Sequence, residues 1–122
     1  MKTNAKIIIV AGISGFLAVL IGALGAHALS GLDDASEHAF ETASEYHFYH
    51  TLALLFTGLA GNEKKWNWIR GFFLAGIILF CGGIYLSVFS GISTFTKVTP
   101  LGGMSFMTGW ILLVWTALKQ EG

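Results

Sequence analysis

The sequence predicts an all-α membrane protein with four transmembrane helices in an up-down-up-down bundle. Two observations lead to this fold class. First, 54% of the 122 residues are apolar and only 11% are charged, whereas soluble domains are about a quarter charged. Second, apolar runs of membrane-crossing length alternate with short polar turns. We expect a single integral membrane domain over residues 1–122, with helices at about 7–29, 37–61, 67–90 and 100–118.

The first helix is predicted from the run Ile7–Leu29, which contains no charged residue. At ~1.5 Å per residue, this run is long enough to cross a hydrocarbon core of ~30 Å. A cleaved signal peptide is the alternative, because Lys2 and Lys6 precede the run and Ala26-His27-Ala28 fits a cleavage site. The run is longer than the ~7–15 residues of a usual signal core, which favours a spanning helix. Small residues at four-residue intervals predict a close contact with another helix; they are Ala18, Gly22 and Ala26.

The second helix, predicted over Glu37–Gly61, has two different faces. Asp34 and Glu37 have the spacing of a capping box at its start. At about 100° per residue, one face is apolar and suits lipid, whereas the other suits packing and hydrogen bonding. The apolar face comprises Phe48, Leu52, Leu55, Phe56 and Leu59, and the packing face comprises Tyr46, His50, Ala53, Thr57 and Gly61.

Carboxylates mark the start of the second helix. Glu37, Glu41 and Glu45 follow at four-residue intervals, after Asp33 and Asp34. Because a carboxylate is costly in hydrocarbon, the bilayer surface is expected near Glu45. A solvated acidic face is favoured over a divalent-cation site.

The third and fourth helices are predicted from the runs Ile69–Phe89 and Leu101–Leu118. Arg70 is expected to extend its long side chain to the lipid headgroups. Thr99 and Pro100 have the residue types of an N-cap and a first helical position. Glycines that bring helices close are predicted at Gly82, Gly83, Gly102, Gly103 and Gly109. The single cysteine, Cys81, is interpreted as a small core residue.

The basic residues indicate the orientation. With four crossings, six of the seven basic residues fall on one side of the membrane, and Lys97 is the exception. Since basic residues favour the cytoplasmic side, both termini are predicted to be cytoplasmic. Topology accounts for these few basic residues, so no nucleic-acid partner is expected.

Four blocks of sequence carry a family resemblance. They are GALGAHAL from Gly22, EYHFYHTLALL from Glu45, GGIYL from Gly82 and TPLGGMSFMTGW from Thr99. These blocks resemble the domain-of-unknown-function 423 family of small bacterial membrane proteins, and the eukaryotic transmembrane protein 256 family is similar. The resemblance implies a four-helix fold in the bacterial cytoplasmic (inner) membrane. It implies no activity and supplies no catalytic residue.

Polar side chains inside the predicted membrane region are the candidates for function, because such residues are costly there. They are His27, Tyr46, His47, His50, Tyr85 and Trp110. A structural or accessory role, in which they hydrogen-bond between helices, is the preferred interpretation. The alternatives are a small proton or cation transporter or channel, and a protein that binds haem, a metal or a quinone.

Neither catalysis nor a particular cofactor is predicted. His47 and His50 are spaced i, i+3, but no further ligands complete a metal motif. No serine belongs to a recognisable nucleophile and base arrangement, so an enzyme is not expected. The expected partners are the lipid bilayer and further copies of the chain or a larger membrane complex.

Overall fold

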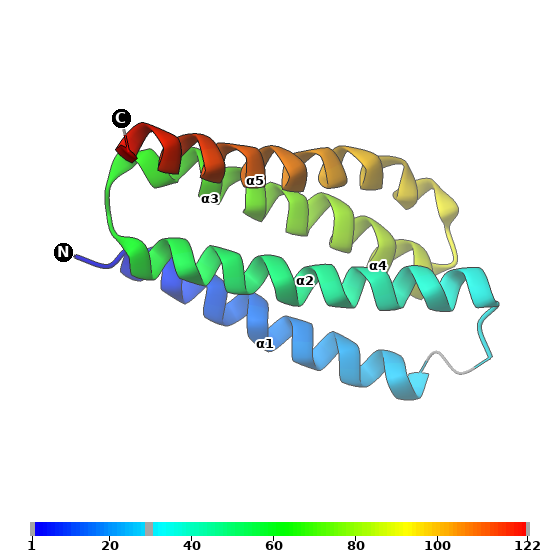
Figure 1. The fold of residues 1–122 in the computed structure, drawn as a ribbon. Helices are drawn as coiled ribbons and strands as arrows, with labels where there is room; N and C mark the ends of the chain where they lie inside the picture. The colour runs from blue at the N-terminus through cyan, green and yellow to red at the C-terminus, as the bar shows by residue number, and fades with distance from the viewer. Residues whose placement is uncertain (1, 29–30, 122) are drawn as a thin grey trace.

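The structure is a computed structural model that describes residues 2–28 and 31–121, and it is helical throughout (Figure 1). Its first two helices are α1 (Ala5–Ala28) and α2 (Asp34–Ala60). The third long helix is continuous but has three parts, which are α3 (Asn67–Gly76), a π-helical turn (Ile77–Cys81) and α4 (Gly82–Ser90). The last helix is α5 (Thr99–Glu121). Short 3₁₀ turns at Lys64–Trp66 and Ser93–Val98 precede α3 and α5.

Helices that follow one another in the chain pack side by side, and α5 also contacts α2. Successive long helices run in opposite directions, with α1 against α2, α2 against the three-part helix, and that helix against α5 (Figure 1). The N- and C-termini and the turn at residues 61–66 lie at one end, which we call the terminal end. The connections at residues 31–33 and 91–98 lie at the other end, the loop end. α1 and α5 are the outer helices, and both expose broad apolar faces.

Three helical stretches within the described residues are long and apolar enough to cross a membrane. They are Ala5–His27, Lys64–Ser90 and Ser93–Gln120. α2 is not among them, because its acidic residues and histidines lower its hydropathy. Composition therefore supports three of the four expected crossings.

The two faces of α2 are placed mainly as the sequence predicts. On the apolar face Leu52, Phe56 and Leu59 are exposed. On the packing face His50 and Thr57 are buried. The helix begins at Asp34, three residues before the predicted start, and Asp33 precedes it in extended backbone. The Ser36 side chain lowers the pKa of the exposed Asp33 carboxyl.

The ends of the last two helices differ in how they form. Gly91 ends α4 in the left-handed region with φ of 76°, and its amide donates to the Ser87 carbonyl at 2.8 Å. The N-cap prediction for Thr99 is wrong, because this residue already has helical angles (φ −58°, ψ −45°). The 3₁₀ turn at Ser93–Val98 leads directly into α5, so no extended cap residue separates the two.

Glycines in α5 and in the three-part helix lie close to phenylalanines of the facing helix, against a ring at Gly76 and Gly109 and against the backbone at Gly102. A Cβ added at Gly102 would lie 2.3 Å from the Phe80 backbone nitrogen, and one at Gly109 would lie 2.6 Å from the Phe73 ring. Gly76 faces the Phe106 ring in the same way, at 2.3 Å. A Cβ added at Gly103 would lie at ordinary contact distance from the Phe80 ring, 3.7 Å. These contacts let α5 approach the three-part helix closely.

Two of the predicted small packing positions are wrong. Ala26 is exposed, and Gly25 instead lies against the Phe40 ring. The buried line on α1 follows Ala11, Ala18 and Gly25, a seven-residue spacing that stays on one helix face over a long contact. Gly22 contacts Ser44, as a packing position should.

The second wrong position is Gly82, which faces open space. Its neighbour Gly83 instead packs on the Phe95 carbonyl and Thr99. The π turn that ends at Cys81 changes which residues of the following helix face inward.

Candidate functional site

Three clusters lie along α2, each centred on a buried polar side chain. We name each cluster after its central residue, and together they connect α2 to every other long helix. The His47 cluster comprises Ser14, His47, Thr51 and Tyr85; the His50 cluster comprises Tyr46, His50, Phe106 and Trp110; and the Arg70 cluster comprises Thr57, Gly61, Asn67 and Arg70.

The His47 cluster joins α1, α2 and α4. The imidazole is 4% exposed. Its Nε2 lies 3.0 Å from the Ser14 hydroxyl, and its Nδ1 lies 3.0 Å from the Tyr85 hydroxyl. Ser14 in turn lies 2.6 Å from the Thr51 hydroxyl. Because a hydroxyl can donate or accept, either neutral tautomer of His47 satisfies this chain.

The His50 cluster joins α2 to α5, and its hydrogen bonds can have only one direction. The His50 Nδ1 lies 2.8 Å from the Tyr46 carbonyl, which can only accept, so Nδ1 carries the proton. The Trp110 Nε1 lies 3.0 Å from the His50 Nε2 and can only donate, so Nε2 accepts. The imidazole stacks on the Phe106 ring at 3.5 Å between centroids. The bond from Trp110 requires a neutral imidazole, because Nε2 must offer a lone pair.

The Arg70 cluster joins α3 to the end of α2, and the expectation that Arg70 reaches the headgroups is wrong. The guanidinium is buried, and its Nη2 donates to the carbonyls of Thr57 and Gly61. Its Nε and Nη1 donate to the side chains of Thr57 and Asn67, both at 3.3 Å. The last carbonyls of a helix have no helical partner and carry partial negative charge, so a cation is held there favourably.

Three further residues singled out from the sequence, His27, Tyr46 and Cys81, have other surroundings. His27 is exposed at the loop end and belongs to none of the clusters. Tyr46 contributes its carbonyl to His50, while its ring stacks on Phe80 with 5.0 Å between centroids. Cys81 is buried, as predicted, and its thiol donates to the Ala43 carbonyl at 3.3 Å.

The sequence interpretation missed Ser14, Thr51 and Arg70 as site residues. Ser14 carries the only hydroxyl of the run Ile7–Leu29, a pattern that indicates a hydrogen-bonding role. Arg70 follows Asn67 by one helical turn and lies shortly after the end of α2. A basic residue at that position indicates a helix-capping role.

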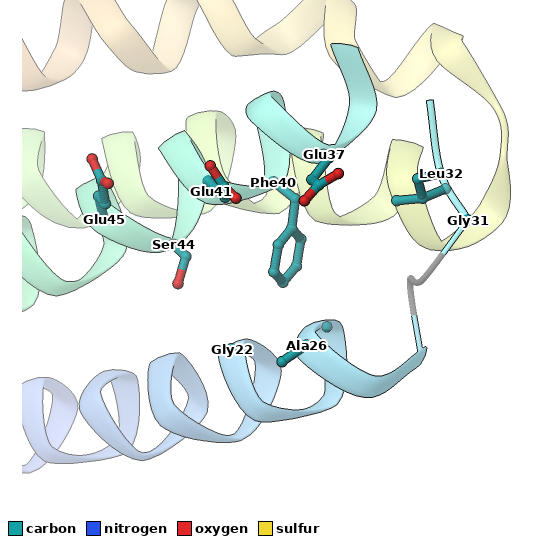
Figure 2. Close-up of a pocket in the computed structure, with 10 residues that line it drawn as sticks. Gly22, Ala26, Gly31, Leu32, Glu37, Phe40, Glu41, Ser44 and Glu45 are labelled. Carbon is teal, nitrogen blue, oxygen red and sulfur yellow. The ribbon is translucent and has the colours of Figure 1, made fainter. Parts of the chain in front are cut away.

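A cleft of about 530 Å³ opens between α1 and α2 near the loop end. Figure 2 shows Phe40 extending from α2 toward Gly22 and Ala26 of α1, with Ser44 on the same side. The cleft is lined further by Glu37, Glu41 and Glu45. Among the residues that the structure describes, no three His, Cys, Asp or Glu side chains come together as a metal site.

The fold and these clusters define a small helical membrane protein whose buried polar groups bond one helix to another. The family model described as "Protein of unknown function (DUF423)" matches residues 21–103, and the chain belongs to this family.

Relatives with membrane-protein names match almost the whole chain. The UPF0382 inner membrane protein YgdD of Escherichia coli is 40% identical over 98% of this chain and 96% of its own length. The UPF0382 membrane protein SAB0533 of Staphylococcus aureus is 37% identical over 94% of this chain and 97% of its own. YwdK of Bacillus subtilis, also named a UPF0382 membrane protein, is 36% identical over 92% of this chain and 95% of its own length. No solved structure matches the chain significantly.

Proposed function

We propose that the protein has a structural or accessory role in the membrane, without catalytic activity or a cofactor of its own. The supporting observation is that all four ring nitrogens of His47 and His50 already have partners within the chain. A metal or haem iron would require a ring nitrogen with a free lone pair. The buried histidines thus serve to fix neighbouring helices.

We further propose that α2 is a fourth membrane crossing and that both termini are cytoplasmic. α2 packs along α1 and also bonds to α4 and α5, and these neighbours are apolar enough to span. Lys2, Lys6, Lys64, Lys65 and Lys119 belong to the terminal end, as the positive-inside rule requires. The name of the E. coli relative supports an inner-membrane location.

Single cysteines test this topology. In a Cys81→Ala background, Ser93→Cys at the loop end and Asn62→Cys at the terminal end form a matched pair. We expect a membrane-impermeant maleimide to label intact cells only at position 93, and position 62 only after permeabilisation. Labelling of both positions in intact cells would contradict the four-crossing arrangement.

The packing gives less support to a transport pathway. The His47 cluster and the Arg70 cluster are separated along α2 by Leu54, which is fully buried. At the terminal end, Gly58 packs against Ile7 and Ile8. A continuous polar path would have to pass this apolar layer, which favours the structural role.

Native mass spectrometry of the protein released from a mild detergent tests the main proposal. We expect copies of the chain, alone or with a protein partner, and no mass of a cofactor. A bound metal or chromophore that is lost in a His50→Ala or His47→Ala variant would overturn the structural role.

A further inference from the structure

The two buried histidines differ in whether they can accept a second proton. The His50 Nε2 faces the indole N–H of Trp110, which is a donor only. A proton on this nitrogen would place two N–H groups against each other. His47 faces a hydroxyl on each side, from Ser14 and Tyr85, and both oxygens can accept. An imidazolium at position 47 would therefore keep both of its hydrogen bonds.

The hydroxyls beside His47 can also donate their own protons elsewhere when they accept from its ring. When Ser14 accepts from His47, its O–H can donate to Thr51, 2.6 Å away. When Tyr85 accepts, its own O–H remains available to donate elsewhere. The loop-end cleft, lined by Ser44, Glu41 and Glu45, opens between α1 and α2, the helices that contribute Ser14, His47 and Thr51 (Figure 2).

We propose that His47 is a proton-binding site whose added charge is held by the hydroxyl oxygens of Ser14 and Tyr85. A hydronium ion gives one proton to the ring nitrogen that carries none in the neutral tautomer, and it leaves as water. Both ring N–H groups then donate, one to Ser14 and one to Tyr85, so the net change is one added proton. This property goes beyond the structural role and makes the junction of α1, α2 and α4 responsive to acidity.

The groups around His47 are hydroxyls, and no charged side chain in the described part of the chain bonds to its ring. α1 contributes Ser14, α2 contributes Thr51, and α4 contributes Tyr85. The π turn contributes Cys81, which lies near Tyr85 and whose thiol bonds to the Ala43 carbonyl. The oxygens of Ser14 and Tyr85 would thus hold the added charge directly.

Nitrogen-15 NMR of the histidine-labelled protein in lipid bilayers tests the site, because it separates the two neutral tautomers from the imidazolium. The chain has four histidines, and the exposed His27 and His38 provide reference signals. On acidification from about pH 8 to about pH 5, the range in which histidine normally changes charge, we expect His47 to become doubly protonated. His50 should remain in its Nδ1–H form. A His47 that stays neutral throughout, or that takes up a proton only after His50, would overturn the proposal.

Two variants make the test specific. Tyr85→Phe removes one acceptor, so His47 should require at least about a tenfold higher proton concentration, which is one pH unit. Trp110→Phe removes the donor beside His50, so it should leave His47 unchanged and allow His50 to titrate. An unchanged His47 titration in Tyr85→Phe would contradict the proposed role of Tyr85. The wild-type order of titration tests the site even if a variant folds poorly.

Discussion

The contacts within the second helical hairpin differ in kind from those between the two hairpins. In the second hairpin, formed by the three-part helix and α5, glycines receive phenylalanine rings. The first hairpin, α1 and α2, meets the second through hydrogen bonds of His47, His50 and Arg70 in addition to apolar packing, such as that of Phe40 and Ala43 in the hydrophobic cluster. In a membrane, close packing supplies much of the helix association, and single polar bonds are weaker but directional. We infer that glycine contacts hold the second hairpin together, while polar bonds set how it meets the first.

The largest expected effect comes from Arg70→Met. This change leaves the buried carbonyls at the end of α2 without donors, and each unsatisfied group costs about 1–3 kcal/mol. We expect a loss of stability of about 3–5 kcal/mol, measured by unfolding in detergent. Arg70→Lys should restore only part of it, because an ammonium lacks the planar fork of donors. Full stability of Arg70→Met would show that this connection is dispensable.

A smaller effect is expected from Gly102→Ala. The new Cβ would meet the Phe80 backbone at 2.3 Å, which a side-chain rotation cannot relieve. Overpacking of this kind typically costs about 1–3 kcal/mol. Gly82→Ala is the matched control, because its Cβ meets open space. The thermal unfolding of both variants should separate them, and equal stability would mean that close approach at Gly102 is unimportant.

The smallest effect is expected from the bond between Trp110 and His50. Interhelical hydrogen bonds in membranes contribute about 0.6–2 kcal/mol. A double-mutant cycle with Trp110→Phe and His50→Leu should give a coupling of about 1 kcal/mol. Because Trp110 also packs on Phe73 at 4.9 Å between centroids, the cycle is needed to remove the packing contribution. A coupling near zero would leave the two hairpins joined at this point by packing alone.

The sequence predicts the helices and their small residues better than it predicts which residues of different helices contact one another. Apolar runs define three of the four long helices, since length and composition are local properties. The small residue of α1 that faces α2 depends on how the two helices cross. The sequence therefore predicts Ala26 at this contact, whereas Gly25 occupies it.

The histidine pairings were harder to predict for a similar reason. The i, i+3 spacing of His47 and His50 suggested a shared role, yet it turns the two rings about 60° apart around α2. One ring therefore bonds to α1 and α4 and the other to α5. A single sequence does not contain the relative placement of those three helices.

The π turn at Ile77–Cys81 changes the phase of the helix that contains it. A π turn inserts about one extra residue into the helical repeat. Before it, Phe73 lies against Gly109 of α5; after it, Tyr85 bonds to His47 of α2. In an uninterrupted α-helix, each residue after this point would be rotated by about 100° relative to its present position. One continuous helix can thus satisfy two interfaces with different periodicities, and the inserted residue acts as the junction between them.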